Sequence, residues 1–242
     1  MPIRLTRAQI LSARRTIQSL DERLPRGAAS LRRAAWAGLQ DSMPRAALLS
    51  LHARVAGTTP TTWEAPSLVQ VWGPRYSAYV VAQRDAAVFT LGRLPASGPT
   101  RRVAEDLAAR MARRLGDDAV VHSEAARALG EPANRLRYAT LTGRIRIRWD
   151  GARQPTIRVV PTPALDPREA RLELARRSLH IFGPQSADGF AAWAGVPPRA
   201  AHATFEELRP SLIEGKNRTA RAQYASVERI TPVTAIRVRR AV

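Results

Sequence analysis

One order of predicted elements recurs three times along the chain, and this repetition constrains the fold more than any other feature. Each cycle holds an amphipathic helix, a short second helix, a turn and a third helix, and β-prone segments follow the first two cycles. Thr6, Thr100 and Asp166 stand where the first helix of each cycle needs an N-cap. Three helices followed by a β-hairpin is the order of a winged helix. The sequence therefore predicts a mainly α fold with β-hairpin wings, an α+β protein of tandem winged-helix or helix-turn-helix modules.

The boundaries of the cycles predict four segments. Residues 1–95 form a first winged helix, residues 96–162 a second, and residues 163–213 a third helix-turn-helix unit, in which Ser186 caps a short helix and Gly195 forms the turn. Residues 214–242 are polar and then alternating, which fits a basic tail or the remnant of a β-domain.

Two hairpins are predicted. In the first module, Tyr76–Ala82 and Ala87–Leu91 are β-prone and flank Gln83-Arg84-Asp85. In the second, residues 144–149 and 156–160 flank Asp150-Gly151, which is a strong hairpin signal.

The charge of the chain points to a polyanionic partner. Lysine and arginine together number 39 against 20 acidic residues, a formal charge of +19, and Lys216 is the only lysine. Arginine forks match phosphates and guanine edges, which favours double-stranded DNA over a membrane surface. The alternative is that arginine is spread as solvated surface in a chain of biased composition.

The predicted wing of the second module carries the most suggestive arginines. Period-two alternation places Arg144, Arg146 and Arg148 on one face of a strand, with Ile145 and Ile147 on the other. We expect this face to bind phosphates. Other candidate DNA contacts lie on helix surfaces and near turns, where solvated surface is an equal alternative; they are Arg14, Arg15, Arg32, Arg33, Arg45 and Arg75.

Several kinds of chemistry lack their motifs. The chain has no cysteine, no HExxH pair, no phosphate-binding loop and no GxSxG elbow, so we expect neither a metal nor a cofactor. It also has no apolar run of about 18 residues and no secretory h-region, so we expect a cytoplasmic, nucleoid-associated protein.

One polar cluster, Gln40-Asp41-Ser42, interrupts an apolar frame between the second and third helices. It is the candidate catalytic group. The alternative is that Asp41 or Ser42 only caps the helix opened by Pro44.

Three segments together resemble one family: GLQDSMPRAALLSLHARV (38–55), LVQVWGPRYSAYVV (68–81) and LARRSLHIFGPQSADGFAAWAGVPPRAAHATFEEL (174–208). The family is that of the crosslink-repair DNA glycosylases of the YcaQ/AlkZ type. The resemblance implies a C-shaped stack of winged helices with a C-terminal β-barrel, and the metal-free release of N-alkylated purines by a monofunctional glycosylase.

The family motif is Gln, any residue, then Gln or Asp. Gln40 matches its first position, whereas Ser42 differs from the third, and the tail after Leu212 does not resemble the barrel. The chain is therefore similar to a truncated or diverged member.

The resemblance implies roles for the three polar residues. Gln40 would orient a water molecule, Asp41 would act as base or electrostatic partner, and Ser42 would add a hydrogen bond. We expect a monomer acting on alkylated or crosslinked duplex DNA. Two alternatives stay open: a non-catalytic DNA-binding regulator or accessory factor, and a gene product that folds only in part.

Overall fold

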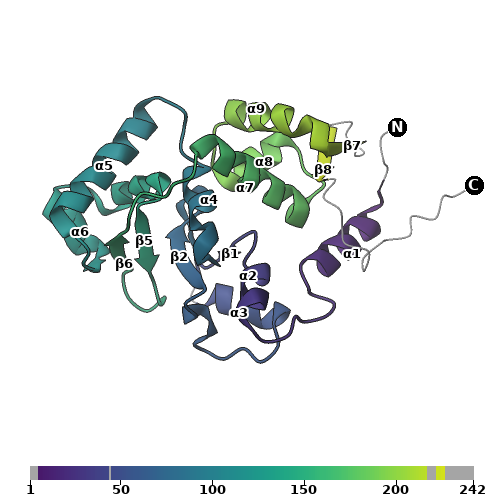
Figure 1. The fold of residues 1–242 in the computed structure, drawn as a ribbon, viewed down its shortest axis with the longest axis horizontal. Coiled ribbons are helices and arrows are strands. Elements are labelled where there is room, and N and C mark those ends of the chain that lie inside the picture. Colours follow the sequence, from purple (N-terminus) through teal and green to yellow (C-terminus); the bar gives the residue numbers. More distant parts are fainter. Residues whose placement is uncertain (1–4, 44, 217–221, 227–242) are drawn as a thin grey trace, which may run out of the picture.

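The computed structural model describes residues 5–43, 45–216 and 222–226. Six of the described strands form one antiparallel sheet in the order β1-β3-β2-β5-β6-β4, and β7 pairs with β8 separately (Figure 1). The protein is thus an α+β fold in which helices surround a shared sheet. No helix in the described part of the chain is long and apolar enough to cross a membrane.

The first unit supplies three strands of the sheet. Its elements are α1 (Arg7–Ile17), α2 (Ala28–Ala34), β1 (Leu39–Gln40), α3 (Ala46–Arg54), the 3-10 turn η1 (Thr62–Glu64), β2 (Leu68–Trp72), β3 (Ala78–Ala82) and α4 (Ala86–Leu91). The Thr6 hydroxyl accepts from the Gln9 backbone N–H while the Gln9 side chain accepts from the Thr6 N–H. This capping box confirms the predicted start of the first helix.

The predicted hairpin of the first unit is wrong in its second half. The strands that pair are β2 and β3, from Leu68 opposite Ala82 to Trp72 opposite Ala78. Ala86–Leu91 is the helix α4, and all its residues except Ala87 are buried. A short apolar run buried on every side has no period, so it cannot be assigned to strand or helix from its sequence.

The second unit supplies the other three strands. Its elements are α5 (Pro99–Leu115), β4 (Val120–Val121), α6 (His122–Leu129), the 3-10 helix η4 (Ala133–Thr142), β5 (Ile145–Arg148) and β6 (Thr156–Val159). The hairpin predicted around Asp150-Gly151 is present, with Ile147 opposite Ile157. Thr100 was expected to cap α5, but Gly98 is the N-cap and Pro99 takes the first helical position.

The third unit packs against β2, β3 and α4 of the first unit. It consists of α7 (Pro167–Phe182), α8 (Ala187–Ala194) and α9 (Pro198–Leu208), followed by β7 (Leu212–Lys216) and β8 (Ala222–Ser226). Asp166 and Ser186 cap α7 and α8, as predicted. The rest of the predicted tail, residues 217–221 and 227–242, lies outside the described residues.

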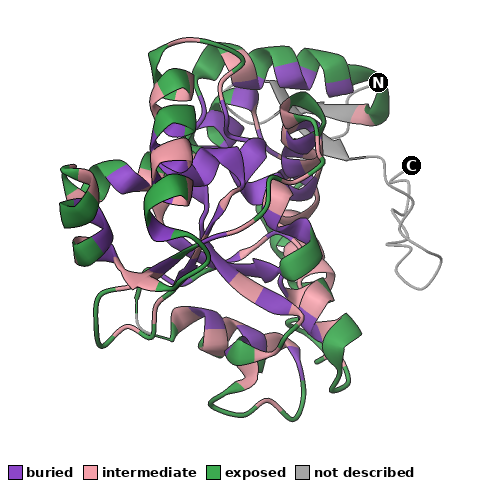
Figure 2. Ribbon diagram, turned by 60° about the vertical axis from the view of Figure 1, so that its left-hand side comes forward, coloured by how far each residue is buried: buried purple, intermediate pink, exposed green. Residues whose placement is uncertain are grey.

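Three larger cores hold these units together, and Figure 2 shows buried residues along the sheet and the helix faces that cover it. The first unit closes around Leu51 and Trp63, and the second around Met111 and Leu136. Phe89 of α4 belongs to the same cluster as residues of α7, α8 and α9. The third unit is therefore joined to the first by a continuous apolar core.

A buried ion pair reinforces this junction. Arg177 of α7 is 6% exposed and contacts Asp85 at 3.0 Å, Glu173 at 2.7 Å and the Trp36 carbonyl oxygen at 3.0 Å. Its guanidinium therefore joins α7 to the turn before α4 and to the end of α2.

Replacing Arg177 with Met should lower the free energy of unfolding by about 3 kcal/mol, because the buried Asp85 carboxylate loses its main partner. Urea unfolding at neutral pH measures this change. Arg176→Met is the matched control: Arg176 is partly exposed and lies 3.8 Å from Glu173, so its loss should cost less than about 1 kcal/mol. Equal losses for the two variants would contradict the assigned junction.

Candidate functional site

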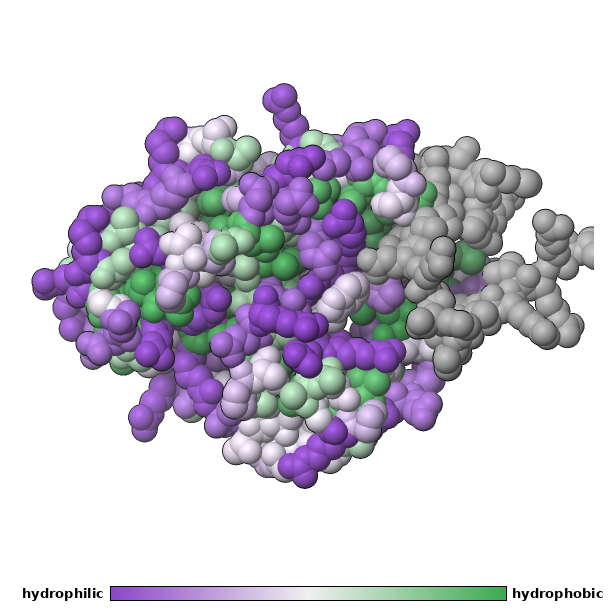
Figure 3. Space-filling view, in the orientation of Figure 1, coloured by the Kyte–Doolittle hydropathy of each residue, from purple (hydrophilic) through white to green (hydrophobic). Residues whose placement is uncertain are grey.

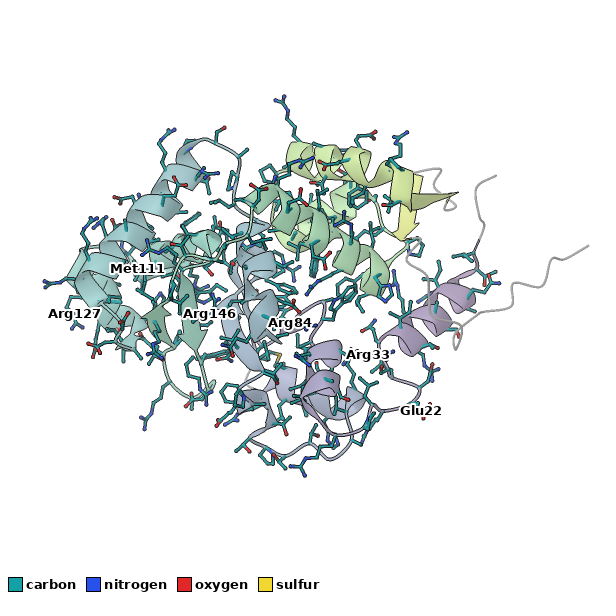
Figure 4. The ribbon with its side chains drawn as sticks, viewed as in Figure 1. Glu22, Arg33, Arg84, Met111, Arg127 and Arg146 are labelled. Atoms are coloured by element: carbon teal, nitrogen blue, oxygen red, sulfur yellow. The ribbon has the colours of Figure 1, made fainter. Side chains whose placement is uncertain are left out.

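Gln40 lies at an open edge of the structure, beside a pocket of about 300 Å³. It is exposed at the end of β1, opposite Tyr79 of β3. The pocket is bounded by the ends of α1, α2 and α7 and by α3. Its lining includes Gln18, Arg33, Gln40, Arg54, Tyr79, Phe182 and Trp193. Figure 4 shows Arg33 on the side of α2 that faces α1. The arrangement therefore combines two amides, two cations and an aromatic wall.

The three residues of the polar cluster do not point the same way. Leu39 and Asp41 are buried while Gln40 and Ser42 are exposed, as alternation along an extended chain requires. Gln40 Nε2 donates a hydrogen bond of 2.7 Å to Ser42 Oγ. The structure thus brings Gln40 and Ser42 together and separates Asp41 from both.

Asp41 is an interior acceptor. Asp41 is only 4% exposed. Its Oδ1 accepts a hydrogen bond of 2.9 Å from the backbone N–H of Ala47, and this bond caps the first turn of α3. Its Oδ2 accepts from Gln70 Nε2 at 2.8 Å. Burial raises the pKa of Asp41, while these two hydrogen bonds act against the rise. Capping is therefore the role that the geometry gives this carboxylate; the Pro44 expected to open the helix lies outside the described residues.

Gln70 is a functional residue that sequence reasoning missed. It is 4% exposed in β2, and besides Asp41 it contacts Trp149: its Oε1 accepts from the Trp149 N–H at 2.7 Å and its Nε2 donates to the Trp149 carbonyl at 3.0 Å. An amide inside an otherwise apolar strand, LVQVW, was the signal for it. Gln70 joins the Gln40 segment to the hairpin of the second unit.

Two of the three candidate arginines of the wing have partners within the protein. Arg146 donates to the carbonyl oxygens of Gly143 and Ile145, and burial lowers its pKa (Figure 4 labels it beside β5). Arg148 pairs with Glu64 at 2.7 Å and lies 4.1 Å from the centre of the Trp63 ring. Arg144 is half-buried. The strand itself holds no acidic residue next to these arginines, and the acidic partner of Arg148, Glu64, comes from η1.

The other candidate arginines divide into two sets. Arg14 donates to the backbone oxygens of Phe182 and Gly183, and Arg15 pairs with Asp21 at 2.6 Å. Exposed positions are held by Arg33, Arg45 and Arg75, and Arg32 is half-buried. Arg45 lies 5.2 Å from the Trp63 ring, on which Arg148 also stacks.

Tyr79 forms the back of the Gln40 pocket. It is 3% exposed, and its pKa is raised by burial while hydrogen bonds with Arg75 and Trp193 oppose the rise. Trp193 also contacts Phe182, with ring centres 5.5 Å apart. Phe182 and Trp193 thus both line the pocket.

Comparisons with known proteins place the chain in a family. The family model described as DNA glycosylase AlkZ-like matches residues 33–237, so the chain belongs to the AlkZ-like DNA glycosylases. The match extends beyond Leu212, into the tail that the sequence analysis found unlike the barrel of the family. Among solved structures, the DNA glycosylase AlkZ of Streptomyces sahachiroi is similar with a TM-score of 0.74 and 15% identity, over 93% of this chain and 71% of that one. A search of curated proteins gave no match.

The described residues contain no group of three or more His, Asp or Glu side chains that would hold a metal ion.

The raised pKa of Asp41 makes stability depend on pH. Its folded-state pKa lies above the unfolded value, so unfolding releases a proton and stability falls as pH rises from about 3.8 through the folded pKa. Asp41→Asn removes this loss, and the free energy of unfolding of the variant minus that of the wild type should increase over the same window. The increase is about 1.4 kcal/mol for each unit by which the pKa is raised. Urea unfolding of both proteins from acid to neutral pH measures it. A difference that falls with pH would refute the buried placement of the carboxylate.

Proposed function

We propose that the protein is a DNA glycosylase that hydrolyses the N-glycosidic bond of N-alkylated purines in duplex DNA. In this proposal residues 1–95 and 96–162 act as winged-helix modules, and residues 163–213 complete the DNA-binding frame. The observation that carries the proposal is the position of Gln40: its side chain is exposed, held by Ser42, and placed beside a pocket with Arg33 and Arg54.

The orientation of the Gln40 amide suits it to hold water. Its Nε2 is already engaged with Ser42 Oγ, and its Oε1 accepts no hydrogen bond from any residue that the structure describes. Oε1 can therefore accept a hydrogen bond from a water molecule and direct its oxygen lone pair toward the anomeric carbon. As the new C–O bond forms, the electrons of the broken C–N bond leave with the purine and the released proton passes to solvent water. An amide held by a second side chain keeps one orientation, which positions the water without reorganisation.

A neutral site is sufficient for this substrate class. A purine alkylated at N7 carries positive charge and departs without a strong acid, so the protein has to place water and tolerate an oxocarbenium-like sugar. Asp41 takes no direct part in this step, because its buried carboxylate already accepts hydrogen bonds from the Ala47 N–H and from Gln70 Nε2. We assign it instead the role of fixing the backbone between Gln40 and Ser42.

Exposed arginines supply attraction for the DNA backbone. Figure 3 shows hydrophilic residues across the middle of the face, between the α7–α9 unit and the α2–α3 unit. We assign phosphate contacts to Arg33, Arg45, Arg75 and Arg148, and internal roles to Arg14 and Arg146, which bond backbone oxygens.

A second candidate function is DNA binding without catalysis, as in a regulator or accessory factor. The observation that favours it is the lining of the Gln40 pocket, which includes no Asp or Glu among the described residues, with Ser42 at the third position of the family motif. A tight complex with alkylated duplex that releases no purine would support this function.

Gln40→Ala should lower the rate of 7-methylguanine release from alkylated duplex DNA by at least about 100-fold, because the water loses its acceptor. Binding of the same duplex should change little, since the amide touches no phosphate in this proposal. Single-turnover base release and fluorescence anisotropy measure the two quantities.

Ser42→Asp provides the complementary test. A carboxylate at this exposed position would face Gln40 Nε2 and add a base, so release should become faster than in the wild type. If neither the wild type nor Ser42→Asp releases purine from a duplex that both bind, the catalytic proposal fails and the binding function is supported.

The assignment of arginines predicts the salt dependence of binding. Arg33→Met and Arg45→Met should each reduce the slope of log K against log salt by about 0.9, the value for one lost phosphate contact. Arg146→Met should leave the slope unchanged, because its guanidinium donates to Gly143 and Ile145. Anisotropy titrations on undamaged duplex at several salt concentrations measure the slopes; a drop for Arg146→Met alone would reverse the assignment.

A further inference from the structure

A second hollow lies on the other side of the Gln40–Ser42 pair. It has a volume of about 540 Å³, within the range of small-molecule sites, and lies between the two hairpins of the sheet. Ser42 forms part of its wall, while Gln40 lines the first pocket. The 2.7 Å hydrogen bond between Gln40 and Ser42 thus joins two separate hollows.

The walls of this hollow are aromatic. Trp72, Tyr76 and Trp149 all line it, and Tyr76 and Trp149 are partly exposed. Trp149 is fixed at three points: its backbone N–H and C=O both bond the buried Gln70 amide, and its indole Nε1 donates to the Arg153 carbonyl at 2.9 Å. A ring held this rigidly is suited to stack a flat ligand, because stacking on it costs no further ordering.

The charged groups that line the hollow are cations. The Arg137 guanidinium lies over the Trp72 ring at 5.8 Å, and it makes no hydrogen bond or ion pair with any residue that the structure describes. Arg153 is exposed at the rim, and the lining includes no Asp or Glu. Arginine brings up to five N–H donors and no acceptor, so the hollow favours a ligand that carries hydrogen-bond acceptors.

We propose that this hollow holds an uncharged nucleobase turned out of the duplex, namely the partner that faces the damaged base. Guanine and the pyrimidines offer carbonyl oxygens to Arg137, and the alkylated purine itself is assigned to the Gln40 pocket. The inference rests on the proposed binding of duplex DNA but not on base release. Trp149 supplies the stacking surface, and Arg137 supplies the hydrogen bonds.

The test compares two duplexes that differ at one position. One is fully paired, and the other carries a tetrahydrofuran abasic analogue opposite guanine, so that this guanine is unpaired. The wild type should bind the second about 10-fold more tightly, since one stacked base contributes about 1–3 kcal/mol. Trp149→Ala and Arg137→Met should each reduce this preference at least about 5-fold.

Matched variants separate this site from a general loss of affinity. Arg127→Met removes one exposed positive charge outside the hollow and should keep the full preference. Arg137→Lys keeps the charge but loses the planar fork, so its preference should fall as in Arg137→Met. Thermal denaturation of each variant verifies folding.

The outcomes divide cleanly. Equal weakening of both duplexes by Arg137→Met, with rescue by Arg137→Lys, would show a phosphate contact and overturn the proposal. A preference that survives both Trp149→Ala and Arg137→Met would show that the protein responds to duplex flexibility alone, and would also overturn it. Because the tetrahydrofuran site has no base to release, neither outcome depends on glycosylase activity.

Discussion

The buried amide of Gln70 is the interaction on which the functional face depends. It binds the Asp41 carboxylate in the first unit and both backbone groups of Trp149 in the second. Asp41 in turn caps α3 through the Ala47 N–H, which leaves Gln40 and Ser42 on the outer side of the chain. An unpaired carboxylate in this place would cost several kcal/mol, so the network holds together because each member satisfies the next. The two hollows beside Gln40 and Ser42 have fixed walls for the same reason.

Many arginines of this chain bind groups inside the protein. The positive charge therefore divides into buried arginines with internal partners and exposed arginines that face solvent. Arg93 is 2% exposed and donates to the carbonyl oxygens of Ala194 and Trp72, with its guanidinium 4.5 Å from the Tyr76 ring. Burial lowers its pKa to about 10, so it remains charged at neutral pH. Arg171 and Arg177 similarly join α7 to the first unit. Only the exposed remainder acts at full strength on a polyanion, so +19 overstates the DNA-binding charge.

Sequence patterns predicted the elements whose signals are local. Capping residues such as Asp166 and Ser186 act within one turn, and the alternation of residues 144–149 is set by neighbouring residues, so both were visible. Ala87–Leu91 was mistaken for a strand because the burial of α4 comes from α7, far along the chain. The site was predicted at Gln40, yet the division between Gln40–Ser42 and Asp41 was not. The cluster was taken as a turn between two helices, whereas residues 39–42 are extended and alternate between buried and exposed; the partner of the buried Asp41, Gln70, lies 29 positions away.

The cations beside Gln40 oppose a positively charged purine, yet the magnitudes leave room for the proposed reaction. Two unit charges about 10 Å apart in water repel by about 0.4 kcal/mol, and each neighbouring phosphate of the DNA offsets that repulsion. A cationic base is therefore tolerated beside Gln40. In the proposed complex the alkylated purine lies at the water-bearing amide, while its uncharged partner occupies the hollow in which Trp149 offers a stacking surface and Arg137 offers hydrogen-bond donors.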